Sequence, residues 1–264
     1  GVAHLAVQLL LHLRDRAPGN DAAALTDRTI ELVETAALCH DLGHYCGSHL
    51  FDRTVSAVLG LPEHEVRGAQ IFRSLAARSK SVITEDETRF VERVMLGRPV
   101  RPSWLSMVVH NSATHLDVDK LDYLARDGYH LGVVQPRVDG RRILQHTRLL
   151  PVPRADNAWE PLPMQLCYDQ RIVGDLWDVF HARYRMFVDY YQHPDSLAVE
   201  SMFGDILRAI HPQLRTWIDA GVRPTDAHIA TLPEWLPGAT SISQEPSTGA
   251  ARICGCPVIS NPPA

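Results

Sequence analysis

The sequence predicts a mostly α-helical protein whose helices enclose a single core. Nearly every patterned segment repeats its apolar residues at intervals of three and four positions, which is the spacing of an amphipathic helix. Residues that cap helices stand at the starts of several of these segments, and convincing strands of alternating pattern are absent. Hydrophobic residues make up 45% of the 264 residues, so the chain can bury a core of ordinary size.

The first two predicted helices lie upstream of residue 45. The apolar stretch 2–13 is too short for a membrane span and lacks the charged leader and cleavage site of a signal peptide. Thr26 can cap the next helix, and Gly43 is its expected end, so His40 and His44 are predicted to share one helix face. The apolar positions of this second helix are Ile30, Val33, Ala37 and Leu38.

Two more helices are predicted between residues 62 and 97. Pro62 suits the first turn of one helix, which puts His64 in its opening turn. Thr84 and Glu87 form the pattern of a capping box, and Gly97 is the expected stop of the helix that follows. The apolar positions of these two helices are Val66, Ala69, Phe72, Leu75, Phe90, Val91, Val94 and Met95.

The later helices include one with a titratable face. In the predicted helix 118–132, Val118, Leu121, Leu124 and Ala125 form the apolar side, and the opposite side holds Asp119, Tyr123, Arg126, Asp127 and His130. Such a stripe either faces water or lines a site. Helices over about 174–191 and after Pro194 are expected to use the apolar residues Leu176, Val179, Phe180, Met186, Phe187, Leu197, Met202, Phe203, Ile206 and Leu207.

Two segments depart from the helical pattern. Residues 137–163 are rich in Arg and Pro, which favours a short irregular or stranded excursion with a basic edge. From residue 232 onward Pro, Gly, Ser and Thr dominate, so 232–264 is expected to be a disordered tail. The expected organisation is therefore a core at 1–231 followed by this tail. Because the chain starts inside an apolar stretch without a methionine, the core is expected to be incomplete at its N-terminus.

Composition limits the classes of partner. A formal charge of −5 provides no general attraction to nucleic acid or to an anionic membrane, so an anionic substrate would need local Arg, Lys or metal charge. A basic stripe with interleaved aromatic residues is also absent, which argues against nucleic-acid binding. Five cysteines without a regular framework favour a reducing, intracellular compartment, cytoplasmic or nuclear.

Residues with chemical potential concentrate between positions 39 and 65. The segment Cys39–His44 (CHDLGH) is followed by Ser48–Asp52 (SHLFD) and then by His64 and Glu65. Imidazole nitrogen and carboxylate oxygen together suit Zn, Mn or Fe. A single histidine here would favour a structural role. Each buried polar group without a partner costs roughly 1–3 kcal/mol, so a fold would rarely gather several of them without a use. The cluster as a whole therefore predicts a metal site.

These motifs resemble a known family. Ala36–His44 (AALCHDLGH) and Ser48–Asp52 resemble the HD motif of the deoxynucleoside triphosphate (dNTP) triphosphohydrolases, in particular the sterile-alpha-motif-and-HD-domain type. Later segments match in the same order, namely Asp117–Asp127 (DVDKLDYLARD), Phe180–Arg183 (FHAR) and Tyr191–His193 (YQH). The resemblance covers roughly residues 1–207 and implies an HD-domain helical bundle.

The resemblance also implies a metal-ligand set. Carried over to this chain, it assigns His40, Asp41 and Asp119 as ligands of Zn, Fe or Mn, with Mg²⁺ accompanying the triphosphate. It further implies a second histidine ligand just upstream of the stretch that matches Gly1. His4 is the nearest histidine but lies one helical turn late in the match. The expectation is therefore either a truncated chain or an incomplete, weaker site.

The remaining roles combine the resemblance with the needs of the reaction. Hydrolysis at the α-phosphorus needs a base that orients water and an acid that protonates the leaving 5′-oxygen, and His49, Asp52 and His64 resemble that group, with His64 as acid or nucleophile-like group. Asp127 resembles the acceptor of the sugar 3′-hydroxyl and Tyr191 a platform for base or sugar. The implied triphosphate contacts are His44, Lys120, Tyr123 and Arg183. Structural alternatives stay open: Lys120 and Arg183 as solvated helix charges, and Tyr191 as a core aromatic. Asp127 could instead be an ion-pair partner of Arg126 or Lys120.

The resemblance predicts hydrolysis of dNTPs to deoxynucleoside and triphosphate. Two alternatives stay open: an HD phosphohydrolase of other nucleotides, and a catalytically impaired paralogue that binds nucleotide or a partner enzyme. The resemblance also implies homo-oligomers assembled through nucleotide, with Arg141 and Arg142 at the positions of a regulatory nucleotide site. For these two arginines a solvated basic loop is the preferred interpretation. Cys254 and Cys256 have no complementary pair, so no zinc site is predicted in the tail.

Overall fold

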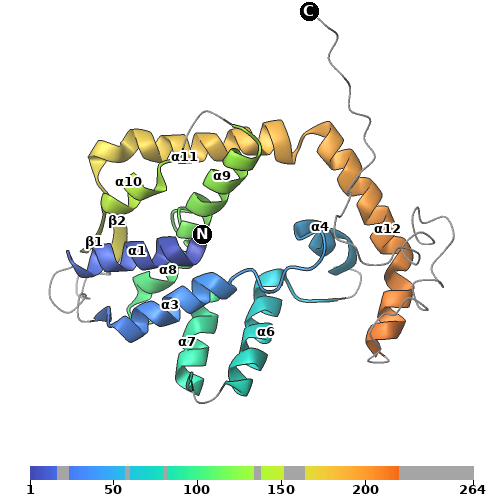
Figure 1. Ribbon diagram of the computed structural model, residues 1–264, viewed down its shortest axis with the longest axis horizontal. Helices are drawn as coiled ribbons and strands as arrows, with labels where there is room; N and C mark the ends of the chain where they lie inside the picture. The colour runs from blue at the N-terminus through green and yellow to red at the C-terminus, as the bar shows by residue number, and fades with distance from the viewer. Residues whose placement is uncertain (17–23, 57–59, 80–81, 134–137, 152–163, 220–264) are drawn as a thin grey trace, which may run out of the picture. The chain divides into compact units, whose positions relative to one another are not determined.

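The predicted mostly α-helical fold with a short stranded excursion is confirmed (Figure 1). The computed structural model describes residues 1–16, 24–56, 60–79, 82–133, 138–151 and 164–219. Its contacts divide the chain into two units, Gly1–Leu207 and Arg208–Ala264, and helix α12 (Pro194–Asp219) begins in the first unit. The predicted boundary after residue 231 and the predicted disordered tail 232–264 lie outside the described residues.

The core of the first unit forms around α1 (Val2–Arg14). This helix packs against α3 (Asp27–Cys39), α9 (Val118–His130) and α10 (Gly140–Gln145), and α3 also contacts α7 (Glu85–Met95). The fully buried side chains at these contacts include Leu10, Leu13, Val33, Val91, Val94 and Ile143. Burial of such side chains contributes roughly 1.5–3 kcal/mol each. The amphipathic pattern of the sequence is therefore the main source of this packing.

The predicted helix caps at Thr26 and Thr84 are confirmed. Thr26 accepts a hydrogen bond from the backbone N–H of Thr29 at 3.1 Å. Thr84 and Glu87 form the reciprocal capping box at the start of α7, with distances of 3.3 and 2.8 Å. Helix α6 (His64–Arg78) has His64 in its opening turn as predicted, whereas Pro62 precedes the helix and does not stand in its first turn.

The excursion at 137–163 contains more order than predicted within its described residues. Asp139 caps the short helix α10 by accepting from the backbone N–H of Arg142 at 3.0 Å. This helix of six residues is too short to show a clear apolar period in the sequence. Strands β1 (Thr147–Pro151) and β2 (Met164–Tyr168) pair antiparallel, with Thr147 opposite Tyr168. Thr147 and Leu149 are buried on this small sheet, so it covers part of the helical core.

The C-terminal helices of the first unit carry an exposed apolar face. Helix α11 (Val173–Met186) contacts α9 and continues into the π-helical turn η4 (Phe187–Tyr191). On α11, Val179 and Met186 are buried as predicted, whereas Phe180 is 42% exposed. The other predicted apolar positions that are largely exposed are Leu38, Leu75, Leu197 and Met202. Periodicity located the helices correctly but overestimated the width of their buried stripes, because a large share of any folded surface is apolar.

The remaining elements of the described residues are short. They are α4 (His49–Phe51), the π-helical turn η1 (Asp52–Ser56), η2 (Ser103–Leu105), α8 (Ser106–Val109) and η3 (Gln170–Ile172). A bilayer crossing demands a long apolar helix, and the described helices include none that qualifies.

Candidate active site

The HD motif lies in a pair of tight turns at the end of α3. The helix ends at Cys39, and the backbone N–H groups of Leu42 and His44 donate to the carbonyl oxygens of Cys39 and Asp41, each at 3.1 Å. The predicted helix end at Gly43 and the predicted shared helix face of His40 and His44 are therefore wrong. The turns nevertheless bring His44 Nε2 to 3.6 Å from Asp41 Oδ1.

Gly43 is required by close packing and not by a helix cap. A Cβ atom at this position would lie 1.8 Å from the backbone oxygen of His64 and 2.5 Å from the backbone nitrogen of Gly68. The backbone of the HD turn thus lies directly against the backbone of α6. Because only glycine permits such an approach, the sequence fixes the distance between the HD motif and His64.

Two carboxylates approach His40: that of Asp41, its neighbour in the turn, and that of Asp119, which is distant in the sequence. The Nε2 atom of His40 lies 3.2 Å from Asp41 Oδ2 and 3.3 Å from Asp119 Oδ1. Asp119 stands in the first turn of α9, which Asp117 caps by accepting from the backbone N–H of Lys120 at 3.0 Å. The structure thus brings together the three residues that the sequence assigned to a metal.

The surroundings of His40 fit a divalent cation. Its Nδ1 atom lies 2.8 Å from the carbonyl oxygen of Ala37, while the buried Nε2 makes no hydrogen bond of good geometry among the described residues, although two carboxylates lie near it. Ligand atoms bound at about 2.0–2.2 Å from one ion are roughly 3–3.5 Å apart, and the Nε2 to carboxylate distances fall in that range. One imidazole nitrogen and two carboxylates are a suitable donor set for a divalent metal.

Electrostatics around His40 support this fit. Burial lowers the pKa of His40, but Asp119 and Asp41 outweigh burial and raise the pKa to about 10. Burial opposes ionisation of Asp41, yet His40 and His44 hold its pKa below its usual value. The two carboxylates therefore attract positive charge to Nε2, and a bound metal would replace the proton there.

His4, the histidine nearest to the expected upstream ligand, is exposed on α1. The position expected for that ligand precedes Gly1.

A cluster of imidazole rings lies beside the HD turn. The His44 ring stacks on the His64 ring with centroids 4.0 Å apart, and the His49 ring lies edge-on to both at 4.9 and 5.0 Å. Together with Asp52, these histidines each present a ligand atom within 4.8 Å of the others. Burial and the neighbouring His64 lower the pKa of His44, so this ring favours the neutral state.

Asp52 connects this cluster to an arginine that the sequence reasoning missed. Its Oδ2 lies 2.9 Å from His64 Nδ1, and its Oδ1 accepts a hydrogen bond of 2.6 Å from Arg67. His64 Nε2 lies 3.3 Å from Glu65 Oε1, so carboxylates flank both nitrogens of His64. Glu65 was noted in the sequence without a role and Arg67 was not considered, because a charged residue inside a helix usually lies on the solvated face.

Three of the residues implied to contact triphosphate lie near one another, namely Lys120, Tyr123 and Arg183. Burial lowers the pKa of Lys120, and the charge of Arg183 lowers it further. Burial raises the pKa of the Tyr123 hydroxyl, and the neighbouring Arg183 partly opposes this shift. The Lys120 ammonium donates to the carbonyl oxygen of His115, and the Arg183 guanidinium lies 4.5 Å from the centre of the Phe187 ring. Two cationic groups and a hydroxyl therefore influence one another, and Lys120 and Tyr123 also feel the charge of Asp119.

Asp127 and Tyr191 form a pair. The Tyr191 hydroxyl donates to Asp127 Oδ2 at 2.5 Å, and burial together with this carboxylate raises the pKa of Tyr191. Asp127 therefore has a hydroxyl group as its partner. The alternative ion pair between Asp127 and Arg126 is not formed, because Arg126 pairs with Asp122 at 3.2 Å. The pair joins the C-terminal half of α9 to η4.

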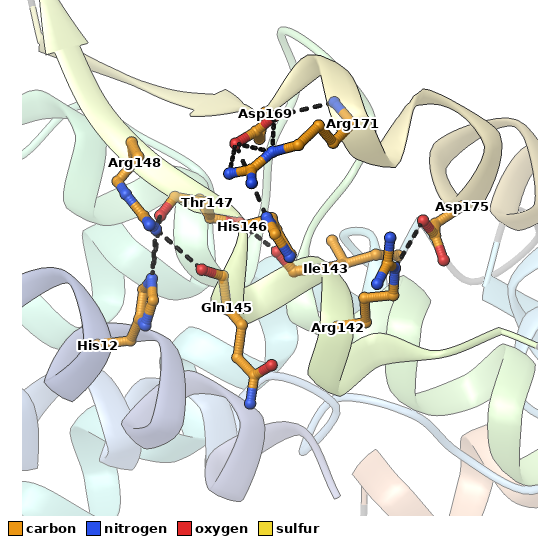
Figure 2. Close-up of polar contacts among 10 residues, drawn as sticks. All are labelled: His12, Arg142, Ile143, Gln145, His146, Thr147, Arg148, Asp169, Arg171 and Asp175. Atoms are coloured by element: carbon orange, nitrogen blue, oxygen red, sulfur yellow. Dashed lines mark hydrogen bonds and ion pairs between the residues drawn. The ribbon is translucent and has the colours of Figure 1, made fainter.

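Arginines in and just after the excursion contact other groups of the protein (Figure 2). Arg142 lies 3.1 Å from Asp175 at the start of α11. Arg171 pairs with Asp169 at 2.6 Å, and Arg148 reaches His12 Nε2 at 2.7 Å. The positive charge of Arg142 is therefore not freely available to an anion.

Comparison with known proteins shows what the chain is similar to. Residues 1–126 match the family model of the HD domain. The chain is 34% identical over 76% of its length to deoxynucleoside triphosphate triphosphohydrolase SAMHD1 of Gallus gallus, and 30% identical over 78% to that of Homo sapiens. It is 28% identical over 78% of its length to the SAMHD1 homolog of Dictyostelium discoideum. The matched region covers 35%, 35% and 38% of these three proteins, so the chain spans about a third of their length. Residues 1–126 of the chain thus match the HD-domain family, and the chain is similar in sequence to the deoxynucleoside triphosphate triphosphohydrolases.

Proposed function

We propose that this protein hydrolyses deoxynucleoside triphosphates to deoxynucleoside and triphosphate. The observation that carries the proposal is the approach of Asp119 Oδ1 to within 3.3 Å of His40 Nε2, beside Asp41 at 3.2 Å. A metal-ligand group in an HD turn is common to phosphohydrolases of this family in general, whereas the neighbouring Lys120, Tyr123 and Arg183 favour a triphosphate. The names of the relatives support the same substrate class.

In this proposal His40, Asp41 and Asp119 hold a divalent metal, which is Zn, Fe or Mn. When bound, the metal polarises a phosphoryl oxygen and lowers the pKa of a water molecule. The chain itself supplies the neutral Nε2 atom and two carboxylates that neutralise the charge of the ion. Mg²⁺ accompanies the triphosphate as its counter-ion.

The proton donor to the departing 5′-oxygen is His64. Its Nδ1 contacts Asp52 at 2.9 Å and its Nε2 contacts Glu65 at 3.3 Å, so a protonated ring can donate to both carboxylates before reaction. Transfer of the Nε2 proton to the leaving oxygen would accompany cleavage of the bond between the α-phosphorus and that oxygen. His49, whose ring centre lies 5.0 Å from that of His64, completes the proton-transfer group, and His44 stacks behind His64 and contacts substrate.

The triphosphate is held by His44, Lys120, Tyr123 and Arg183, because several fixed donors spread over the negative charge stabilise it better than one. The lowered pKa of Lys120 reflects crowding with Arg183 and burial, both of which an incoming polyanion would offset. Asp127 accepts the sugar 3′-hydroxyl and Tyr191 packs on the sugar or base. Binding of the sugar would then compete with the present hydrogen bond between Tyr191 and Asp127.

We infer that the protein acts as a homo-oligomer inside the cell, in the cytoplasm or nucleus. An exposed apolar stripe on α11 supports self-association; its members are Val173, Trp177, Phe180 and Tyr184, spaced by four, three and four residues. A regulatory nucleotide at Arg142 would have to compete with Asp175 for the guanidinium.

The proposal is tested by incubating the purified chain with Mn²⁺ and each dNTP and separating the products by anion exchange. Tripolyphosphate and deoxynucleoside in equal amounts are expected, and a His40→Gln variant should release neither. Monophosphate with pyrophosphate would contradict the proposal and favour another phosphohydrolase class. A chain that neither retains metal nor releases product would favour the nucleotide-binding paralogue.

A further inference from the structure

A buried arginine joins the parts of the site that come from different segments of the chain. Arg67 on α6 is only 4% exposed. Its Nε donates to the carbonyl oxygen of Gly43 at 3.1 Å, and one terminal nitrogen donates to Ser56 Oγ at 2.8 Å and to the carbonyl oxygen of Pro62. Its other terminal nitrogen donates to Asp52 Oδ1 at 2.6 Å. The guanidinium thus contacts the HD turn, η1, the approach to α6 and a site carboxylate.

The hydrogen bonds of Asp52 are divided between two partners. Oδ1 faces Arg67 and Oδ2 faces His64 Nδ1, so the carboxylate is held from both sides. Aromatic rings enclose the guanidinium: Tyr45 lies 4.9 Å and Phe51 6.0 Å from it. A charge-assisted hydrogen bond in such surroundings is stronger and more restrictive than an exposed one.

The arrangement also answers whether the imidazole cluster is a second metal site. The ligand atoms of His44, His49, Asp52 and His64 are close enough for one. However, both oxygens of Asp52 are already engaged, and a guanidinium lies 2.6 Å from the carboxylate that an ion would need. A second cation there would meet the repulsion of Arg67. The guanidinium therefore serves as the cation of this cluster.

We propose that Arg67 is a positioning residue that acts through Asp52 to hold His64 as proton donor. The proposal rests on the proposed function for its reaction, but the contact it describes exists without substrate. By fixing the carboxylate, Arg67 fixes the direction of the His64 ring and so the position of Nε2, which lies 3.3 Å from Glu65 Oε1 in the absence of substrate. Loss of the guanidinium would free Asp52 to rotate and His64 with it.

The charge of Asp52 follows from the same contact. Burial would raise the pKa of Asp52, but Arg67 first and His64 second hold it below its usual value. The titratable groups facing Asp52 are Arg67 and His64 on α6, with the rings of His44 and His49 beside them. An ionised Asp52 accepts the Nδ1 proton, whereas a protonated Asp52 would compete with it.

The test is a double-mutant cycle on kcat, combining Arg67→Met with Asp52→Asn. If Arg67 acts through Asp52, Arg67→Met alone should lower kcat about 100-fold, as expected for a misplaced catalytic group, with KM changed less than about 3-fold. In the Asp52→Asn background the same change should cost less than about 3-fold. Arg53→Ala is the matched control. Arg53 follows Asp52 in η1, is exposed and pairs with Glu200 at 2.6 Å, so its loss should leave kcat unchanged.

A second variant and a spectroscopic readout keep the test decisive. Arg67→Lys retains the charge and most of the buried stem, so it carries the same cycle should the methionine variant fail to fold. One-dimensional ¹H NMR of the protein without substrate should show the His64 Nδ1 proton downfield, with its identity checked by loss in His64→Gln. This signal should disappear in either Arg67 variant and persist in Arg53→Ala.

The outcomes separate the two proposals. An equal loss of kcat in both backgrounds, or a persistent Nδ1 signal in folded Arg67 variants, would overturn the positioning role and leave Arg67 a structural residue. Absence of triphosphohydrolase activity in the wild-type chain would instead count against the proposed function. In that case the NMR signal alone still decides whether Arg67 holds the Asp52 and His64 pair.

Discussion

Close backbone packing of Gly43 against α6 should set the distance between the HD turn and His64. In Gly43→Ala, the new methyl group would lie 1.8 Å from the backbone oxygen of His64, whereas ordinary contact begins near 3.4 Å. The HD turn and α6 must therefore separate by about 1.6 Å, because the obstructing atoms belong to the backbone and cannot rotate away. This is enough to disturb the 4.0 Å stack of His44 on His64.

A displacement of about 1 Å in an active site can cost roughly 100-fold in rate. We therefore expect Gly43→Ala to lower kcat/KM for dNTP hydrolysis at least 100-fold. Overpacking of this kind also destabilises by roughly 1–3 kcal/mol, which corresponds to a fall in Tm of several degrees for a chain of this size.

The assay is steady-state dNTP hydrolysis together with thermal melting. Gly174→Ala is the control, because a Cβ at Gly174 in α11 would meet no atom within 4 Å. This change should leave kcat/KM unaltered and raise the stability slightly, since alanine favours a helix over glycine by about 1 kcal/mol. Wild-type activity and Tm in Gly43→Ala would refute the claim that backbone packing sets the site geometry.

Three further predictions address the metal, the oligomer and the fold. Asp119→Asn should lower the Mn²⁺ affinity measured by calorimetry by more than the roughly 10–100-fold that is typical of losing a supporting contact. Asp122→Asn on the same helix should leave this affinity unchanged. Equal affinities of the two variants would contradict the ligand role of Asp119. Trp177→Asp, in the exposed stripe of α11, should convert the oligomer to monomer in light scattering, while Tyr129→Asp on α9 should not. Thr84→Ala removes the capping bond of α7 and should cost about 1 kcal/mol, seen as a Tm lowered by a few degrees with unchanged activity.

Local signals in the sequence predicted much of the fold. The caps at Thr26 and Thr84 and the apolar periods of α3, α6, α7 and α9 are decided by neighbouring residues, so the sequence could reveal them. The same periods could not say which apolar residues stay exposed. Leu38 is 73% exposed although it follows the period of α3, because burial depends on which helices arrive from elsewhere in the chain.

The candidate site divides in the same way. The HD turn and Asp119 were found through motifs that resemble a family, and the structure brings His40, Asp41 and Asp119 together. The geometry of the motif was predicted as a helix because His40 and His44 have helical spacing, yet tight turns place them instead. Arg67 was missed because its four contacts come from Gly43, Asp52, Ser56 and Pro62, and no local pattern announces such a meeting.

The two halves of the site differ in how their negative charge is balanced. At His40 two carboxylates face one imidazole and raise its pKa to about 10, so this half strongly attracts a cation from outside the protein. At His64 the carboxylate of Asp52 already has the guanidinium of Arg67. His44 links the halves, with Nε2 3.6 Å from Asp41 and its ring stacked on His64. A metal should therefore occupy the first half alone, and the second should remain free to move protons; this division follows from the placement of one buried arginine.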